Sequence, residues 1–450
     1  MRSVGATSSV RRTRSTSQVS GGDSTPLMQG GQRRHRPDYR IVLFVGLLML
    51  IGLIVMYAIG PQRANVLNEV HNTTFYTDTY FVVKQLASLG LAIVAFAIMM
   101  TIPYETMKKY GLRILQVTLG LSALLFIFGN VLHVDAIAAN TLGAYRWFNL
   151  GIFGSFQPAE AMKLALIIYM SGFLAVRYRE GKINDVNATV YPMLVLSVLV
   201  LFIVVVLQKD MGTGIAVAST IFMMLIASGM TWKILGKIVL GGIIAAILLT
   251  VFVPHRLERL MTYFQGDNAS SQSADSADSN YHIKNAMIAL GTGGIAGRGI
   301  GQSVQATGYL PEAINDSIFA IMGEIFGFVG TTLIVVLFGA LLMQLLRISD
   351  HQPDISMRIA VAGIFGWLGA HVILNVASMI GLIPLTGITL PLLSFGGTSM
   401  ILMTGALGLA FQLSRYTAHQ PVPLKEAGDE NSMRRRGVGG SRYSGRRGHQ

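Results

Sequence analysis

The sequence predicts an all-α polytopic integral membrane protein. Of its 450 residues, 52% are hydrophobic and only 13% are charged, a balance too apolar for a soluble protein of this length. The apolar residues also gather in ten runs, each close to the roughly 20 residues that a helix needs to cross a bilayer. Because cysteine is absent, disulfides, thiol nucleophiles and thiolate metal sites are excluded.

The excess positive charge lies at the two ends of the chain. Residues 1–40 hold eight arginines against two aspartates, and residues 415–450 hold eight basic against three acidic residues. Both ends are rich in Gly and Ser and lack interleaved aromatics, which favours disordered cytoplasmic tails near anionic lipid over nucleic-acid binding. We therefore expect a basic tail at 1–40, a transmembrane domain at 41–415 and a second basic tail at 416–450.

The lysines and arginines of the short connections give the expected orientation. They alternate to the side of the basic tails, so both termini are predicted to be cytoplasmic, which requires an even number of spans. Long connections at 134–158 and 254–316 then lie outside, and loops of that length are usually functional. The predicted spans are 41–60, 81–103, 112–133, 159–176, 190–208, 211–229, 235–253, 317–347, 359–383 and 390–414.

The large external connection, 254–316, divides into two parts. Residues 267–280 are rich in Ser, Asp and Asn, and we expect them to be mobile. Residues 291–308 are rich in glycine and have little helix or strand propensity.

The first candidate site lies where connection 134–158 leads into span four. Glu160 and Lys163 are one helical turn apart and can pair within the membrane, where an ionisable residue suggests a function. A structural ion pair that pins the helices together is the alternative. Arg146, which precedes Trp147, is a candidate anion contact or an interfacial anchor.

The tight turn between spans five and six contains Asp210, followed by Gly212, Thr213 and Gly214. This aspartate lies near the external surface, where it is a candidate site residue. The alternative is that it caps the helix that follows.

The glycine-rich stretch and the start of span eight form the strongest motif. The glycines around Arg298 allow close backbone approach to a ligand, and their N–H groups are candidate donors to phosphate oxygens. No strand precedes them, so a dinucleotide-binding fingerprint is not supported. Asp316 stands where the external loop enters span eight, where partial desolvation would raise its pKa toward that of a general base. Capping of that helix together with Asn315 is the alternative.

The last motif surrounds the connection between spans nine and ten. His371 and Asn375 are one turn apart on span nine, and a Pro- and Gly-interrupted stretch follows, with Ser394 near its end. Irregular backbone at membrane depth must line a cavity or be buried in protein. Helix packing through small residues is the competing account for Gly396 and Gly397.

Taken together, these stretches resemble the SEDS (shape, elongation, division and sporulation) family, typified by FtsW and RodA, over about residues 41–415. The resemblance implies a peptidoglycan glycosyltransferase that polymerises lipid II and works with a class B penicillin-binding transpeptidase. Asp316 matches the catalytic aspartate of the family. Ala306 stands where lysine is usual, so Arg298 is a candidate replacement for that pyrophosphate contact. The implied substrate-binding residues are Arg146, Glu160, Lys163, Asp210, Arg298, Ser303, Gln305, Glu312, Asn375 and Ser394.

The expected reaction is an inverting transfer at the outer face of the cytoplasmic membrane of a bacterium. Asp316 would deprotonate the acceptor hydroxyl, which attacks the anomeric carbon and displaces a pyrophosphate. The charge of that leaving group would be balanced by Arg146, Lys163 or Arg298, or by a divalent cation (Mg²⁺ or Mn²⁺) near Asp316 and Glu312. No other cofactor is expected.

Three alternatives remain at the level of sequence. Charged residues within spans and broken helices also suit a lipid II flippase or transporter, and a non-enzymatic division scaffold would use mainly the tails. An elongation, RodA-like role is the third. The pair Gly323–Glu324 and the long basic N-terminal tail favour an FtsW-like role at the division septum, with other divisome proteins as partners.

Overall fold

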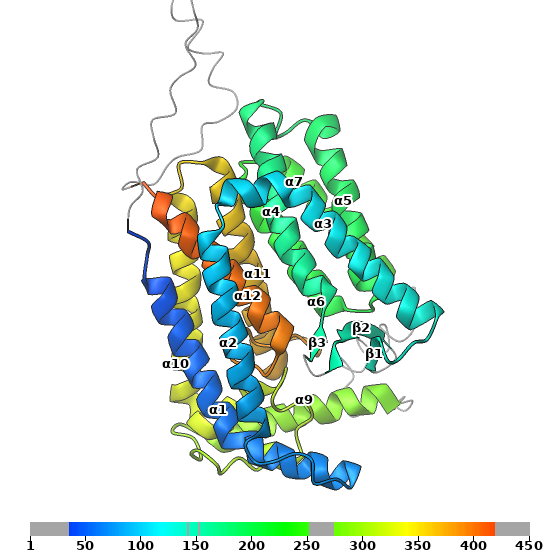
Figure 1. Cartoon of the computed structure of the whole chain (residues 1–450), viewed down its shortest axis with the longest axis vertical. Coiled ribbons are helices and arrows are strands. Elements are labelled where there is room, and N and C mark those ends of the chain that lie inside the picture. The colour runs from blue at the N-terminus through cyan, green and yellow to red at the C-terminus, as the bar shows by residue number, and fades with distance from the viewer. Residues whose placement is uncertain (1–35, 142–143, 152–153, 252–273, 419–450) are drawn as a thin grey trace, which may run out of the picture. The chain divides into compact units, whose positions relative to one another are not determined.

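The computed structural model describes residues 36–141, 144–151, 154–251 and 274–418, which are mostly helical (Figure 1). The predicted tails at 1–40 and 416–450 therefore lie almost wholly outside the described residues. The main helices are α1 (Arg40–His71), α2 (Tyr80–Thr101), α3 (Tyr104–Phe126), α4 (Pro158–Arg179), α5 (Tyr191–Leu201), α6 (Met211–Ala227), α7 (Trp232–Val251), α9 (Ala274–Gly293), α10 (Ile318–Asp350), α11 (Ile355–Met379) and α12 (Gly397–Leu413). Shorter elements are the π-helical turns η1 (Ile127–Val131), η3 (Val186–Val190) and η4 (Phe202–Leu207) and the 3₁₀ turns η6 (Gln305–Thr307) and η7 (Ser414–Tyr416).

Each of the ten predicted spans contains a helix. In the described part of the chain, 8 helices are long and apolar enough to cross a membrane. The two remaining predicted spans correspond to α6, with 17 residues, and α7, with 20. The start predicted at residue 390 is wrong, because residues 390–396 form turns and α12 begins at Gly397. The chain is a multi-pass membrane protein, and the count of ten spans stays a prediction.

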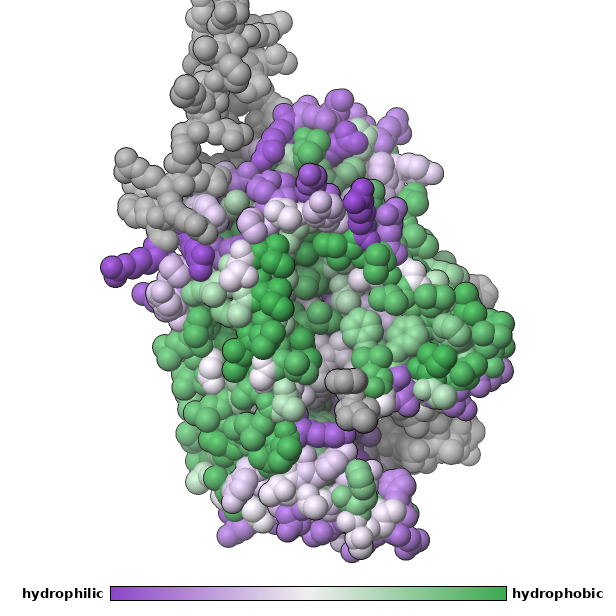
Figure 2. Space-filling model, viewed as in Figure 1, coloured by the Kyte–Doolittle hydropathy of each residue, from purple (hydrophilic) through white to green (hydrophobic). Residues whose placement is uncertain are grey.

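The surface of the helical domain carries an apolar band between polar ends (Figure 2), which is the pattern expected where lipid surrounds the helices. Helix α11 lies at the centre of the domain, because 78% of its apolar 18-residue stretch is buried. In α2 only 17% of the corresponding stretch is buried. Helix α12 packs closely on α2: a Cβ added at Gly408 would lie 2.6 Å from the carbonyl oxygen of Phe96. Small residues thus bring these two helices together.

The first and last described segments meet at one end of the helical domain. The N–H of Asp38, just before α1, donates to Ser414 Oγ at the end of α12, at 2.9 Å. The chain therefore enters and leaves the domain on the same side, which supports an even number of crossings. That this side is cytoplasmic stays a prediction.

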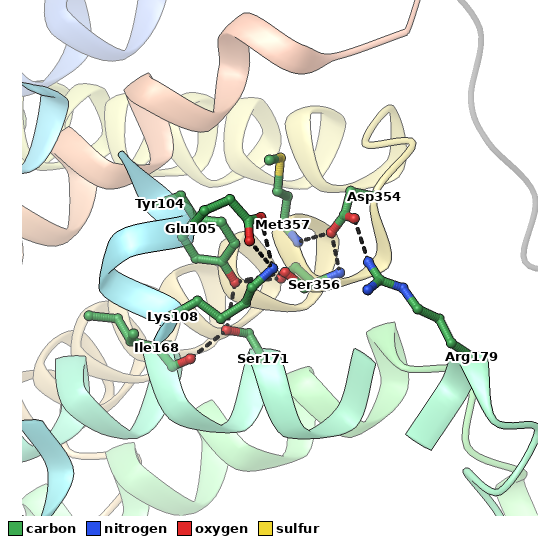
Figure 3. A network of polar contacts seen from close by, with 9 residues as sticks. All are labelled: Tyr104, Glu105, Lys108, Ile168, Ser171, Arg179, Asp354, Ser356 and Met357. Carbon is green, nitrogen blue, oxygen red and sulfur yellow. Dashed lines mark hydrogen bonds and ion pairs between the residues drawn. The ribbon is translucent and has the colours of Figure 1, made fainter. Parts of the chain in front are cut away.

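A polar network links three helices, α3, α4 and α11 (Figure 3). The hydroxyl of Tyr104 hydrogen-bonds Ser171 Oγ at 2.8 Å and donates to the carbonyl of Ser356 at 3.1 Å. Asp354 caps α11 and pairs with Arg179 at 2.7 Å. These contacts hold α3, α4 and α11 together.

A small antiparallel sheet occupies the external connection predicted at 134–158. Its strands are β1 (Ala138–Thr141), β2 (Ala144–Asn149) and β3 (Ser155–Phe156), in the order β1-β2-β3. The Thr398 hydroxyl donates to the carbonyl of Ser155 at 2.6 Å, which ties the sheet to the start of α12. The sequence did not anticipate these strands.

The large connection, 254–316, contains a helix that the sequence did not suggest. Residues 267–273 lie outside the described residues, and 274–280 form the first turns of α9. The expected mobility of 267–280 stays a prediction. Helix α9 packs on α10, where Gly323 has no Cβ to meet the Leu290 side chain. Residues 294–304 are irregular, as expected from their glycines.

Candidate active site

Asp316 lies in the turn just before α10. Ser317 occupies the N-cap position of α10 without a side-chain capping bond, so the alternative that Asp316 or Asn315 caps this helix is wrong. The Oδ1 atom of Asp316 is buried and has no hydrogen-bond partner among the described residues. Burial, helped by the negative charge of Glu312, raises the pKa of Asp316 to about 7. A carboxylate with this pKa is suited to act as a general base near neutral pH.

The turn before Asp316 contains a residue in an uncommon conformation. Glu312 has a φ of 49°, in the left-handed region that few non-glycine residues adopt. Its carbonyl accepts the N–H groups of Asn315 and Ser317, and its Oε2 accepts from Asn315 Nδ2 at 2.5 Å. The Glu312 side chain is exposed and is held over the turn by this bond.

Three consecutive carbonyls of the turn are held by α11 and the segment that follows it. The Phe395 N–H donates to Ile314 at 2.8 Å and the Ser394 hydroxyl to Asn315 at 2.6 Å. Asn375 Nδ2, on α11, donates to the carbonyl of Asp316 at 2.7 Å. Asn375 and Ser394, both predicted site residues, thus fix the backbone that carries Asp316.

Glu160 and Lys163 form the predicted ion pair. Both are buried, with 2.6 Å between Lys163 Nζ and Glu160 Oε1. Lys163 Nζ also lies 2.9 Å from His371 Nε2, which accepts a second bond from Trp367 Nε1. Because Nε2 of His371 accepts from both, its Nδ1 carries the hydrogen and donates to the carbonyl of Thr389 at 3.3 Å.

The same segment therefore anchors the ion pair and Asp316. Asn375 donates to the carbonyl of Ile388 as well as to that of Asp316, and His371 donates to the next residue, Thr389. Gly212 on α6 packs directly against this segment, because a Cβ there would lie 2.6 Å from the Thr386 oxygen. Segment 386–390 is thus the common support of both groups.

Asp210 and Arg146 fix the turn between α5 and α6. Asp210 caps α6, which is the alternative role predicted from the sequence. Its carboxylate accepts the Thr213 N–H and hydroxyl at 2.9 Å each. Arg146, on β2, donates to the carbonyls of Gln208 at 3.2 Å and Lys209 at 2.8 Å. These two predicted site residues hold backbone groups and join the small sheet to the helices.

The sequence motifs did not reveal that Glu324 anchors the glycine-rich stretch. Its carboxylate, on α10, is fully buried and accepts from Ser303 Oγ at 2.6 Å, Val304 N at 3.0 Å and Gln305 N at 3.2 Å. Arg298 Nη1 lies 3.8 Å from the same carboxylate, and its side chain is partly exposed. Ser303, Gln305 and Arg298 thus surround one carboxylate.

The first glycines of the glycine-rich stretch allow it to pack closely on α10. The N–H groups of Gly297 and Gly299 donate to the carbonyls of Gly293 and Ile325, so the hypothesis that glycine N–H groups receive phosphate oxygens is wrong for these two. The Arg298 N–H donates to the carbonyl of Glu324. A Cβ on Gly297 would lie 2.2 Å from the Ile325 oxygen, and Gly327 on α10 has a φ of 67° where the helix is kinked. Two glycines therefore let the loop reach the backbone of α10.

No group of three or more His, Asp or Glu side chains that could hold a metal ion occurs among the described residues. Glu312 and Asp316 are neighbouring carboxylates; Glu312 is exposed and Asp316 is half-buried. Any cation there would take its other ligands from substrate and water.

Comparison with known proteins places this geometry in a family. Residues 39–419 match the model of the FtsW, RodA and SpoVE proteins, described as "Cell cycle protein". The chain belongs to this family. Stage V sporulation protein E of Bacillus subtilis, one relative, is 32% identical over 390 residues, covering 86% of this chain and 99% of that protein. The probable peptidoglycan glycosyltransferase FtsW of Aliivibrio salmonicida is 32% identical, covering 76% of this chain and 82% of its own.

Solved structures of other proteins share the fold. A chain from a peptidoglycan synthase complex that coordinates polymerization and crosslinking has a TM-score of 0.64 and 22% identity, and the match covers 85% of this chain and 99% of that one. The rod shape determining protein RodA of Thermus thermophilus has a TM-score of 0.59 and 22% identity, with coverages of 88% and 100%. The helical architecture is therefore that of the family.

Proposed function

We propose that this chain is a peptidoglycan glycosyltransferase that polymerises lipid II into glycan strands at the outer face of the cytoplasmic membrane. The observation that carries the proposal is Asp316: a desolvated carboxylate with a pKa of about 7, on a turn whose carbonyls are held from α11 and its following segment. Family membership and the names of the relatives support the same activity.

In this mechanism Asp316 accepts the proton of the acceptor sugar hydroxyl. The hydroxyl oxygen forms a bond to the anomeric carbon of the donor while the bond from that carbon to the lipid pyrophosphate breaks. The electron pair leaves with the pyrophosphate, and attack from the opposite face inverts the anomeric centre. Because pyrophosphate is a good leaving group, a single base suffices.

The leaving pyrophosphate needs positive charge close to it. Arg146 and Arg298 are both partly exposed and suit this role better than Lys163, which is fully buried and bonded to Glu160 and His371. A divalent cation, Mg²⁺ or Mn²⁺, near Glu312 and Asp316 would neutralise the same charge.

The proposed partner is a class B penicillin-binding transpeptidase. The similarity to a chain from a complex that coordinates polymerization and crosslinking supports this pairing. We place the activity at the division septum with other divisome proteins, on the FtsW-like features of the sequence. Depletion of this protein that blocks septum formation but not rod elongation would support this placement, and the reverse would assign an elongation role.

The test uses the purified full-length chain with its transpeptidase partner and fluorescent lipid II. The wild type is expected to form glycan strands, and Asp316→Asn to form almost none while remaining folded, with a melting temperature no lower than that of the wild type. Normal polymerisation by the Asn variant would refute the assignment of the base. A wild type that only moves lipid II between leaflets would identify a transporter.

A further inference from the structure

A histidine on α9 contacts the turn that carries Asp316. His282 is buried, and its Nε2 lies 2.5 Å from Ser317 Oγ, next to Asp316 in the chain. Helix α9 belongs to the large external connection, and no other side-chain bond between α9 and this turn is present in the described residues.

The direction of these hydrogen bonds follows from the geometry. The Ser317 hydroxyl donates to the carbonyl of Pro311 at 2.8 Å, at the other end of the turn. The hydroxyl hydrogen of Ser317 is therefore used in the bond to Pro311. In the contact between His282 and Ser317, Nε2 of His282 must carry the hydrogen and donate it to Ser317 Oγ. The chain from His282 through Ser317 to Pro311 closes the turn around Asp316.

We propose that His282 is a positioning residue for the reaction proposed above, and that it fixes, through Ser317, how deeply the Asp316 carboxylate is buried. The inference rests on the proposed function of Asp316. It adds a third support to the turn, from α9, beside Asn375 on α11 and Ser394 before α12.

The charges around His282 suit a neutral donor. Burial lowers the pKa of His282 below its ordinary value, and Glu312 opposes this only in part. The ring is then neutral near pH 7, and its Nε2 hydrogen points at Ser317. The imidazole thus supports the turn without competing with Asp316 for the proton of the acceptor.

The test compares His282→Leu, His282→Gln and Ser317→Ala in the full-length protein with its partner. Loss of the donor lets water reach Asp316, which lowers its pKa, so the acid limb of the rate profile should shift to lower pH. The kcat of the Leu and Ala variants should fall between about tenfold and about 100-fold with little change in KM. The Gln variant, whose amide can donate from the same place, should keep most of the rate and the wild-type pH profile.

A matched control lies one turn along α9. Asn285 is buried, but its amide donates to the carbonyl of Tyr281 within α9, so Asn285→Leu should leave the pH profile in place. The double variant His282→Leu/Ser317→Ala should be no slower than the slower single variant, since both break one chain of bonds.

Three outcomes would overturn the inference. They are a Leu variant with the wild-type rate and pH profile, a Gln variant as slow as the Leu variant, and additive effects in the double variant. Unfolding transitions measured for every variant separate misfolding from mispositioning. Failure of the wild type to polymerise lipid II would instead refute the proposed function itself.

Discussion

The amide nitrogen of Asn375 lies 2.7 Å from the carbonyl oxygen of Asp316 and 2.7 Å from that of Ile388. One buried side chain thus joins the turn before α10 to the segment between α11 and α12. His371, one turn earlier on α11, donates to the next carbonyl of that segment and accepts from Lys163. The candidate base and the buried ion pair therefore share one support.

Replacing Asn375 should slow the reaction without removing the base. We expect Asn375→Ala to lower the polymerisation rate by about tenfold or more, because the turn loses a bond at Asp316. Asn375→Asp should be slower still, since a carboxylate would face two carbonyl oxygens. Ser378→Ala is the control, because that hydroxyl bonds only carbonyls of its own helix. Rates near wild type for both Asn375 variants would contradict the role given to this contact.

Asp316 should determine the pH dependence of the rate. With a pKa of about 7, the base loses its function as pH falls through 7, so the rate should drop on the acid side. Above pH 7, Asp316→Asn should lower the rate by about 100-fold to about 10,000-fold, the usual contribution of a general base, and the difference from wild type should shrink as pH falls. Measuring the rates of the wild type and of Asp316→Asn from pH 5 to 9 checks both predictions. An Asn variant whose rate falls on the acid side as the wild-type rate does would show that Asp316 is not the base.

The same shift predicts the sign of a stability effect. The folded-state pKa of Asp316 lies above its ordinary value, so the folded protein binds a proton more tightly than the unfolded chain. Stability from this group is full at low pH and falls as pH rises toward 7. Asp316→Asn should therefore raise the melting temperature at pH 8 and change it little at pH 4. A lower melting temperature at pH 8 would contradict the desolvation of this carboxylate.

The ion pair Glu160–Lys163 should be sensitive to loss of one partner. Lys163→Met leaves a buried carboxylate unpaired and should cost about 3–5 kcal/mol of unfolding free energy. The double variant Glu160→Gln/Lys163→Met removes both charges and should be more stable than the single one. Lys108→Met is the matched control, since its pair with Glu105 has the same spacing but is exposed, and it should cost less than about 1 kcal/mol (Figure 3). A double variant no more stable than Lys163→Met would contradict this account.

Two glycines of the loop offer a steric comparison. Gly297 and Gly301 both have positive φ, 84° and 79°, but only at Gly297 would a Cβ meet another backbone atom, the Ile325 oxygen at 2.2 Å. Alanine should therefore lower the unfolding temperature at both sites through backbone strain and considerably more at Gly297. Equal losses at the two positions would show that the loop does not pack on α10 in this way.

The sequence by itself determined the features that depend on local spacing. Apolar runs of sufficient length predicted helices in all ten ranges, because backbone groups in lipid must be satisfied within their own segment. The pair Glu160–Lys163 and the Asp210 cap were predictable because their partners lie three residues away. Asp316 was found from its motif and from its place at the membrane boundary.

The tertiary structure decided what holds that aspartate. Asn375 is 59 residues from Asp316, Ser394 is 79 from Asn315, and Lys163 is 208 from His371. These bonds join side chains to groups on other helices, and no local periodicity marks them. Helix α9 was missed because its polar first turns have weak propensity and its second half is stabilised by packing on α10. Contacts of this kind exist only once the helices have packed, so only the folded molecule could reveal them.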